Sequence, residues 1–509
     1  MATAPRLDLR FLVFLCMYGG AGGMPAWAGN WQITPSITVN ETATDNVGLI
    51  DKNRESDWIT DIAPGINING RGDRLKLSFD YRLHGLYYAN DSSRNNIQNS
   101  LNALGSLEVL ENLFFIDANA TISQQNLSAF GGSTNTSVNI NDSGNTTETR
   151  TYRISPYFKG ILGSSTEYLL RYDLGKTSSD EGNAFSTQTR QLTGRLAGTA
   201  GFSWLGWSLD ANRQKNDFDQ GRDTTSNLVR GMLTYRYSPQ LRVSLIGGRE
   251  SNDYVSVDEK SHTIKGGGFE WAPTERTLLS AFREDRFFGN SDNISFTHRT
   301  ARTAWKYIQT KDTQTSNDRI SGTVGTYFSL LDSMFSSAIP DPVARAAFVN
   351  AMLLSSGLSP NAALQGGFLT TGVTLQERKE LSLALLGARN TVTFAATRSE
   401  TQDVSNGTGS GWFLGTDFST LNNVKQTGAS VNWSHKLSGL SSLSGSVSRL
   451  QSKGTGDSPL KTDETMYTVN FVTQLGPKTN AGLSARRIEV DGTTNYTENA
   501  LTGTFSHRF

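Results

Sequence analysis

Residues Asp73 to Tyr88 read DRLKLSFDYRLHGLYY, and apolar and polar side chains alternate along this stretch. A strand places alternate residues on opposite faces, whereas a helix would scatter them around its circumference. The apolar face would carry Leu75, Leu77, Phe79, Tyr81 and Leu83, and the polar face Arg74, Lys76, Asp80, Arg82 and His84. The stretch exceeds the ~5–6 residues of a typical soluble strand and reaches the ~9–11 that cross a bilayer at a tilt. It predicts a membrane-spanning strand with one lipid-facing side.

The same alternation recurs along the chain, as a transmembrane barrel requires. It is found at 167–174, 229–237, 241–245, 431–437 and 467–475. Aromatic residues near segment ends, such as Tyr87 and Trp271, match the girdles that mark the two membrane interfaces. A soluble β-sandwich with one face in water would explain each segment alone. The repetition instead favours an all-β fold, a large antiparallel transmembrane β-barrel.

Short turns and long polar connections follow one another along the chain. Short turns are expected at 70–72, 111–112, 238–240, 272–274, 387–390, 438–439 and 476–478, and long loops at 124–147, 177–185, 215–225, 401–423 and 452–463. This asymmetry is typical of barrels with short periplasmic turns and longer outer loops. We count about 20 candidate strands, in a range of roughly 16–22, and closure favours an even number. Wall side chains alone cannot fill so wide a barrel, so its interior holds water, a plug or both.

The N-terminus indicates export. Arginines flank a short apolar run at 11–18, and small residues follow it. This is the layout of a secretory signal peptide, because a transmembrane helix would need ~20 apolar residues. Ala26 and Ala28 offer the small side chains of a cleavage site, so residues 1–28 are expected to be removed. The single cysteine, Cys16, would leave with them, and the mature chain would then form no disulfides.

The C-terminus resembles an outer-membrane assembly signal. The residues that share one parity here are Leu501, Gly503, Phe505, His507 and Phe509. Such signals are read by the machinery that inserts barrels into the bacterial outer membrane. His507 departs from the aliphatic or aromatic residue that is more usual at its position. The terminus predicts an outer-membrane location, with membrane lipid, lipopolysaccharide and the assembly machinery as partners.

The overall charge gives no reason to expect a nucleic-acid partner. Lys and Arg together number 47, and so do Asp and Glu. The balance instead suits a lumen of mixed charge, which would hydrate solutes of either sign. The inward positions predicted from the alternation are Arg74, Lys76, Asp80, Arg82, Glu167, Arg171, Asp173, Arg230, Arg236 and Arg242.

The alternation disappears between 329 and 365. Within this segment Asp341 is a suitable helix N-cap, Pro342 fits the first helical turn and Gly357 suits a left-handed terminator. The helix would include Val343, Arg345, Phe348, Met352 and Leu353. It is too short to span a membrane, so it needs a protein surface to cover it. We expect a short helical insertion that plugs or gates the lumen; a loop helix without a gating role is the alternative.

Two stretches carry a family resemblance: IPDPVAR at 339–345 and LALLGARNTVTF at 383–394. They resemble the PEP-CTERM system-associated outer-membrane protein family, whose members resemble large porin-like barrels. The similarity extends over most of the mature chain. The resemblance implies an association with exosortase and exopolysaccharide loci, with exopolysaccharide or secretion-system components as further partners. It implies no catalytic residues.

The sequence contains only weak candidates for catalytic or metal-binding sites. The five histidines lie on separate predicted strands and form neither a zinc-helix motif nor a nucleophile elbow. We therefore predict no enzyme activity, no catalytic residues and no cofactor, although distant strands could still assemble a Ser–His or Asp–His site. Asp217, Asp219 and Asp223 alternate around a glycine as calcium loops do, but the closing glutamate is missing and Arg222 intrudes. This loop predicts a weak calcium site at most.

These features together predict an outer-membrane porin or channel, associated with an exosortase system and with exopolysaccharide export or cell-surface assembly. Two alternatives remain open. One is a closed structural or adhesin-like barrel whose loops bind outside partners, and the other is an outer-membrane barrel hydrolase. Conductance would separate a channel from a closed barrel, whereas a cluster of Ser, Asp or His at strand ends would favour the hydrolase.

Overall fold

The computed structural model describes residues 29–509, apart from 135–137, 142, 180–184, 220–221, 316–327, 329–330, 333–334, 336–338, 340–344, 347–348, 350–367, 371, 405–416, 419–420 and 457–458. The expected signal peptide, with Ala26 and Ala28, lies outside these residues. The described part of the chain is built of β-strands. None of its helices is long and apolar enough to cross a membrane.

The strands form one closed ring. They are β1 (Gly29–Thr44), β2 (Asp57–Gly72), β3 (Leu75–Tyr88), β4 (Asn96–Leu110), β5 (Phe114–Asn126), β6 (Thr146–Leu162), β7 (Thr166–Ser179), β8 (Ser186–Thr199), β9 (Leu205–Phe218), β10 (Thr224–Arg236), β11 (Leu241–Asn252), β12 (Lys260–Thr274), β13 (Thr277–Arg286), β14 (Gly289–Arg299), β15 (Thr303–Gln314), β16 (Thr374–Leu386), β17 (Asn390–Asp403), β18 (Leu421–Lys436), β19 (Ser441–Gly456), β20 (Lys461–Gly476), β21 (Thr479–Gly492) and β22 (Tyr496–Arg508), with a short 3-10 helix, η3, at Ser92–Arg94.

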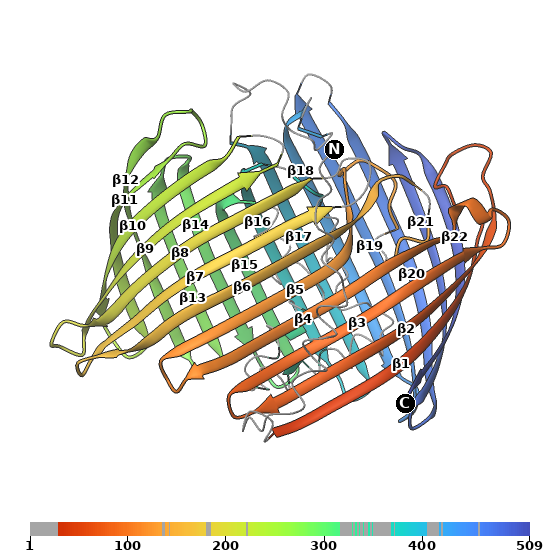
Figure 1. The fold of residues 1–509 in the computed structure, drawn as a ribbon, viewed down its shortest axis with the longest axis horizontal. Helices are drawn as coiled ribbons and strands as arrows, with labels where there is room; N and C mark the ends of the chain where they lie inside the picture. Colours follow the sequence, from red (N-terminus) through yellow and green to blue (C-terminus); the bar gives the residue numbers. More distant parts are fainter. Residues whose placement is uncertain are drawn as a thin grey trace, which may run out of the picture.

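Each strand pairs antiparallel with its neighbours in sequence, and β1 also pairs with β22. The pairing closes the sheet into the barrel of tilted strands shown in Figure 1. The predicted all-β barrel is thereby confirmed. Its 22 strands are an even number at the upper end of the expected range.

The pairing register determines which residues share a face, because paired residues point to the same side of a sheet. On β7, Leu170 and Tyr172 are 48% and 38% exposed, whereas Asp173 beside them is buried. Leu192 on β8 and Leu209 on β9 continue the exposed apolar surface. The alternation in the sequence thus produces an apolar outer wall and a polar inner wall.

The connections differ between the two rims of the barrel. The rim that holds the C-terminus has short turns, such as 73–74 and 477–478, and we call it the short-turn rim. The opposite, long-loop rim has the connections 45–56, 127–145 and 315–373. Figure 1 shows the C-terminus at the lower rim and longer connections at the upper rim. In bacterial barrels the short turns lie on the periplasmic side.

The expected helical insertion falls in the connection 315–373 between β15 and β16. Because Thr374–Leu386 is a single strand, this connection lies at the long-loop rim, a point that the sequence leaves open. Its described helical residues are Phe328, Leu331, Asp332, Phe335, Arg345, Ala346 and Val349. The other expected helix residues lie outside the described ones: Asp341, Pro342, Val343, Phe348, Met352 and Leu353.

Candidate functional site

Residues of the connection 127–145 fold into the barrel. Tyr496 on β22 accepts a hydrogen bond from the Ser133 N–H at 3.1 Å and donates one to the Ser133 carbonyl at 2.9 Å. Asn141 donates to the Glu498 carboxylate at 3.1 Å. The strands β1 to β4 separate β22 from β5 along the wall, so these contacts cross the interior. They identify the faces of Tyr496 and Glu498 as inward.

A polar contact joins this connection to the connection 404–420. The buried Asp417 accepts hydrogen bonds from the Ser128 hydroxyl at 2.6 Å and from the Ala129 N–H at 2.8 Å. We call these three residues the loop latch. Burial raises the pKa of the Asp417 carboxyl above its ordinary value, although both hydrogen bonds act in the opposite direction. The latch therefore holds a carboxyl that is sensitive to pH.

Apolar packing surrounds the loop latch. Phe130 of the connection 127–145, Phe368 of the connection 315–373 and Leu421 of β18 belong to one buried cluster. Burying a side chain of this size stabilises by about 1.5–3 kcal/mol relative to leaving it exposed. Segments far apart in the sequence thus pack together at the long-loop rim and cover part of the mouth.

A second cluster covers the wall at β11 and β13. Tyr254, from the connection between β11 and β12, packs with Val373 and Val404. Next to this cluster, Arg286 pairs with Glu250 at 2.7 Å, and their side chains are only 10% and 3% exposed. The pair is therefore shielded from water at this height of the wall.

The helical insertion reaches deep into the lumen. Asp332 pairs with Arg345 at 2.8 Å, which joins two helical stretches, and Leu331 and Val349 are buried. Asp332 also interacts electrostatically with Lys306, which lies on the inner face of β15 close to the short-turn rim. A carboxylate that enters from the long-loop rim and acts on this lysine lies well inside the barrel. This geometry supports the plug hypothesis.

Below the covering connections, the inner wall carries ion pairs at positions that the alternation predicts. Arg230 pairs with Glu284 at 2.7 Å and Arg242 with Glu270 at 2.9 Å. Two further pairs of predicted lumen residues are also in contact: Asp80 lies 3.5 Å from Arg82, and Asp173 lies 3.0 Å from Arg171. The remaining predicted lumen residues lie at the short-turn rim: Arg74, Lys76, Glu167 and Arg236. The accessible lumen therefore combines both signs of charge.

The alternation does not predict an aromatic patch on the inner wall, but the structure contains one. Tyr157 on β6 stacks on Phe115 of β5, with ring centroids 5.2 Å apart. Lys159 lies 4.2 Å over the Phe115 ring and Arg171 lies 5.1 Å over the Tyr157 ring. Asp117 holds Arg171 at 2.9 Å. We call these residues the inner aromatic patch; they lie near the short-turn rim, where β5 begins and β6 ends.

The expected calcium residues are engaged in other contacts. Asp217 pairs with Lys215 at 2.8 Å and with Arg190 at 3.1 Å, and Lys215 also lies 3.8 Å from Asp223. The backbone N–H of Asp219 donates to the Ser186 carbonyl at 3.0 Å. Across the described ranges, no group of three or more His, Cys, Asp or Glu side chains is arranged to hold a metal ion. A calcium site in this loop stays a prediction.

An acid–histidine pair lies on the inner wall near the long-loop rim. His84 Nδ1 is 3.0 Å from Asp61, and both side chains are buried. Two members of a Ser–His–Asp arrangement therefore meet. Among the described residues, the hydrogen bonds of His84 go to Asp61 alone, so the pair has no attached nucleophile.

The expected assembly signal lies on the outer wall. The register with β1 places Leu501, Gly503, Phe505 and His507 on one outward face, which Phe509 extends. The Leu501, Phe505 and Phe509 side chains are exposed. His507 bonds to the Thr479 hydroxyl at 2.9 Å, and its ring lies 5.0 Å from that of Phe509. Recognition of this face by the assembly machinery stays a prediction.

No protein-family model and no curated protein sequence matches this chain. Solved structures do match its architecture. The siderophore receptors PirA from Pseudomonas aeruginosa and PirA from Acinetobacter baumannii are 9% and 8% identical, with TM-scores of 0.39 and 0.48; each match covers 94% of this chain and 80% of the receptor. OccAB2 from Acinetobacter baumannii is 8% identical, with a TM-score of 0.36, over 94% of this chain and 98% of that one. The chain is similar to these barrels in fold.

Proposed function

We propose that the chain is a channel of the bacterial outer membrane whose outer mouth is covered by its own connections. The observation that carries this proposal is the closed ring of 22 antiparallel strands with an apolar outer wall. In hydrocarbon every backbone N–H and C=O must be bonded internally, and a closed barrel achieves this without a free edge. An apolar surface of this extent would be unfavourable in water.

We also propose that the cargo is an acidic saccharide, which is consistent with the exopolysaccharide link implied by the family resemblance. The half-buried ring of Tyr157 faces the lumen, and its apolar surface suits stacking on a sugar ring. The exposed Lys159 beside it and Arg171 supply cations for carboxylate groups. A polymer that arrives from the periplasm would meet the inner aromatic patch first.

Conductance in planar bilayers tests the channel and the plug together. The wild-type barrel should conduct weakly, and deletion of 337–360 should raise the single-channel conductance because it removes part of the insertion from the lumen. Heat-modifiable migration shows whether the variant still forms a barrel. An unchanged conductance in a folded variant would remove the plug. No conductance from either protein would favour the closed, adhesin-like barrel.

The cargo is tested by blocking the current with acidic oligosaccharides added on the short-turn side. We expect Tyr157→Ala to shorten the dwell time of the blocked state about 10-fold, a loss of ~1.4 kcal/mol. Tyr152→Ala is the matched control, because Tyr152 lies on the same strand but on the outer wall, where it is exposed. Equal dwell times in the two variants would contradict an acidic saccharide at this patch.

The exosortase association is a separate proposal, supported by the resemblance at 339–345 and 383–394. The genomic neighbourhood of the gene should then contain exosortase or polysaccharide biosynthesis genes. A deletion strain should secrete less polysaccharide than its parent. Normal secretion in the deletion strain would argue against the link while leaving the channel proposal intact.

A further inference from the structure

Three lysines lie side by side on the outer wall near the long-loop rim. Lys425 on β18 is in register with Lys453 on β19, which is in register with Lys461 on β20. Lys453, at the centre of the row, is exposed and makes no ion pair with another described residue. Like charges directly opposite one another destabilise a sheet. The row is therefore unfavourable unless anionic groups lie beside it or over it, and Lys453 at its centre is the least compensated member.

The carboxylates nearby neutralise this row only in part, and one of them, Glu400 on β17, is in register with Lys425. Asp463 lies 2.6 Å from Lys461 and 3.6 Å from Arg449, so a single carboxylate serves two cations. Asp491 on β21 is in register with Asp463 and not with a lysine of the row. We call Lys425, Arg449, Lys453 and Lys461 the outer cation cluster. These four cations outnumber the nearby carboxylates Glu400, Asp463 and Asp491, and Lys453 pairs with none of the described ones, which suits a negatively charged ligand.

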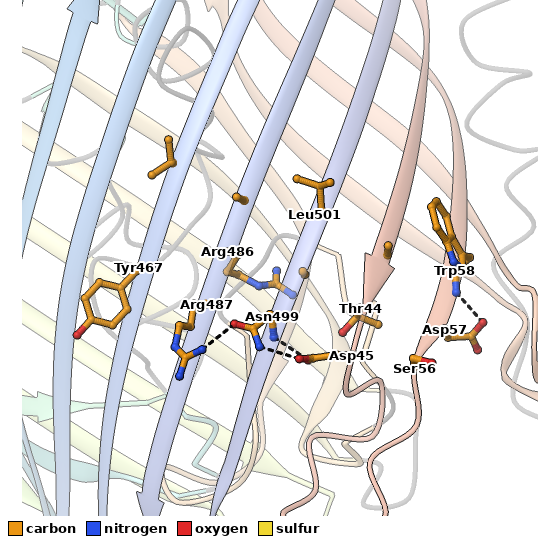
Figure 2. A pocket seen from close by; sticks show the side chains of 14 residues that line it. Thr44, Asp45, Ser56, Asp57, Trp58, Tyr467, Arg486, Arg487, Asn499 and Leu501 are labelled. Carbon is orange, nitrogen blue, oxygen red and sulfur yellow. Dashed lines mark hydrogen bonds between the residues drawn. The ribbon is translucent and has the colours of Figure 1, made fainter.

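An apolar groove of about 620 Å³ lies on the same wall, between β20 and β2. Figure 2 shows Tyr467 and Trp58 at its two sides and Leu501 between them. Ala43 and Ala485 also line it, and their small side chains leave room for a ligand. Since β20 runs from the outer cation cluster toward the short-turn rim, the groove begins about 20 Å farther along that strand.

Polar side chains line the groove toward the long-loop rim. Arg487, which is 51% exposed, donates to Asn499 at 3.0 Å and to Glu489 at 2.7 Å. Asn499 donates in turn to Asp45 at 2.6 Å, as Figure 2 shows. The groove therefore changes from apolar to polar toward the long-loop rim, and the outer cation cluster lies farther along β20, in the order in which a lipid changes from acyl chain to headgroup.

We propose that this face of the barrel binds a phosphorylated glycolipid with the chemistry of diphosphoryl lipid A. An acyl chain occupies the groove, and the phosphates lie on the outer cation cluster. Long lysine and arginine side chains are suited to binding phosphate at a membrane interface. The site rests on the proposed outer-membrane location, in which the long-loop rim faces the outer leaflet. A soluble anion has no apolar chain that could occupy the groove.

Native mass spectrometry of the full mature barrel in detergent tests the site, with diphosphoryl lipid A, monophosphoryl lipid A, phosphatidylglycerol and inorganic phosphate as probes. We expect diphosphoryl lipid A to bind most tightly. A triple variant, Lys425→Gln, Lys453→Gln and Lys461→Gln, should bind it at least ~10-fold more weakly. The matched control carries Lys265→Gln, Lys311→Gln and Lys379→Gln, which remove outer-face lysines from other strands.

Filling the groove with Ala485→Trp should also weaken lipid A binding. Equal lipid A affinity in the triple variant and its control would overturn the site. Phosphatidylglycerol or inorganic phosphate binding as tightly as lipid A would overturn it too, because neither combines acyl chains with paired phosphates on one sugar headgroup. The triple variant should conduct like its control. Lipid A binding by a barrel that never conducts would contradict the channel and leave the lipid site standing.

Discussion

Glu498 carries a charge but has no exposed surface. Arg486 donates a hydrogen bond to the Glu498 carboxylate at 2.8 Å, and the Thr44 hydroxyl donates another at 2.9 Å. Asn141 of the connection 127–145 donates a third. A buried pair of this kind is a strong local constraint, because loss of one partner leaves the other charge desolvated. The residue thus couples the seam of the barrel to the segment that covers its mouth.

Glu498→Ala should lower the free energy of unfolding by about 3–5 kcal/mol, because Arg486 would stay buried without its partner. Urea titration of the barrel refolded in detergent measures this change. Glu167→Ala is the control: Glu167 is exposed at the short-turn rim, and its loss should change stability by less than ~0.5 kcal/mol. Equal losses of unfolding free energy in the two variants would contradict a stabilising role of the buried Glu498.

The loop latch should tighten in acid. Because the pKa of Asp417 is raised in the latched state, its stabilising contribution is fully present below the ordinary value of 3.8 and is lost as pH rises through the raised pKa. We expect the open probability in planar bilayers to fall when the pH is lowered toward this range. Asp417→Asn, which has no carboxyl to titrate, should stay latched at neutral pH. An unaltered acid response in this variant would rule out Asp417 as the sensor.

The lumen residues were only partly predictable. Parity correctly separates Arg230 and Arg242 from the apolar face, but it says nothing about their partners Glu284 and Glu270. The inner aromatic patch escapes the pattern for a physical reason: β5 begins with two phenylalanines, of which one faces each wall. A rule that assigns aromatic residues to the lipid side therefore overlooks Phe115.

At the scale of single elements, the last strand offers a test. Deletion of Phe509 should reduce the fraction of folded barrel in cells several-fold, because the assembly signal loses its terminal aromatic residue. Refolding in detergent should change little, since Phe509 is exposed at the end of the sheet. Heat-modifiable migration measures both fractions. Leu483→Ala, at an exposed outer position on β21, is the control. Normal assembly without Phe509 would contradict the signal.

The alternation identifies β3 well, but the glycines before it lead to a turn prediction that is displaced from the observed turn. A turn is expected at 70–72, whereas β2 continues to Gly72 and the turn lies at 73–74. The reason is packing: a Cβ atom at position 70 would lie 2.1 Å from the Trp31 ring of β1. Glycine is needed there to accept an indole across the strands, and its presence therefore mimics a turn signal.

At the scale of the whole molecule, the outer and inner walls should differ in how strongly the same substitution destabilises the barrel. Leu192 points outward and is 44% exposed, and Leu104 points inward and is 46% exposed. Leu192→Arg should destabilise the barrel in lipid bilayers by ~2–4 kcal/mol, whereas Leu104→Arg should be nearly neutral because water reaches it. Denaturant titrations in liposomes measure both. Similar losses in the two variants would show that the outer wall does not face lipid.

The exact strand number was beyond the sequence pattern. The connection between β13 and β14 consists of Phe287 and Phe288, although it lies at the long-loop rim. A rule that expects long loops on the outer side and short turns on the other does not predict a two-residue connection at the long-loop rim. The covering of the mouth was equally hidden, because it depends on contacts such as that of Ser133 with Tyr496, which are remote in sequence.

The meeting of β1 with β22 has a consequence for biosynthesis. Their register runs from Ser36 opposite Arg508 to Thr44 opposite Ala500, and hydroxyl groups join across it at Thr38 and Ser506. Synthesis must therefore reach β22 before β1 can pair with its second neighbouring strand. Any prematurely terminated product would retain two unsatisfied margins, which invite aggregation and proteolysis. An incomplete copy would therefore be exposed to proteases before it could form a closed barrel.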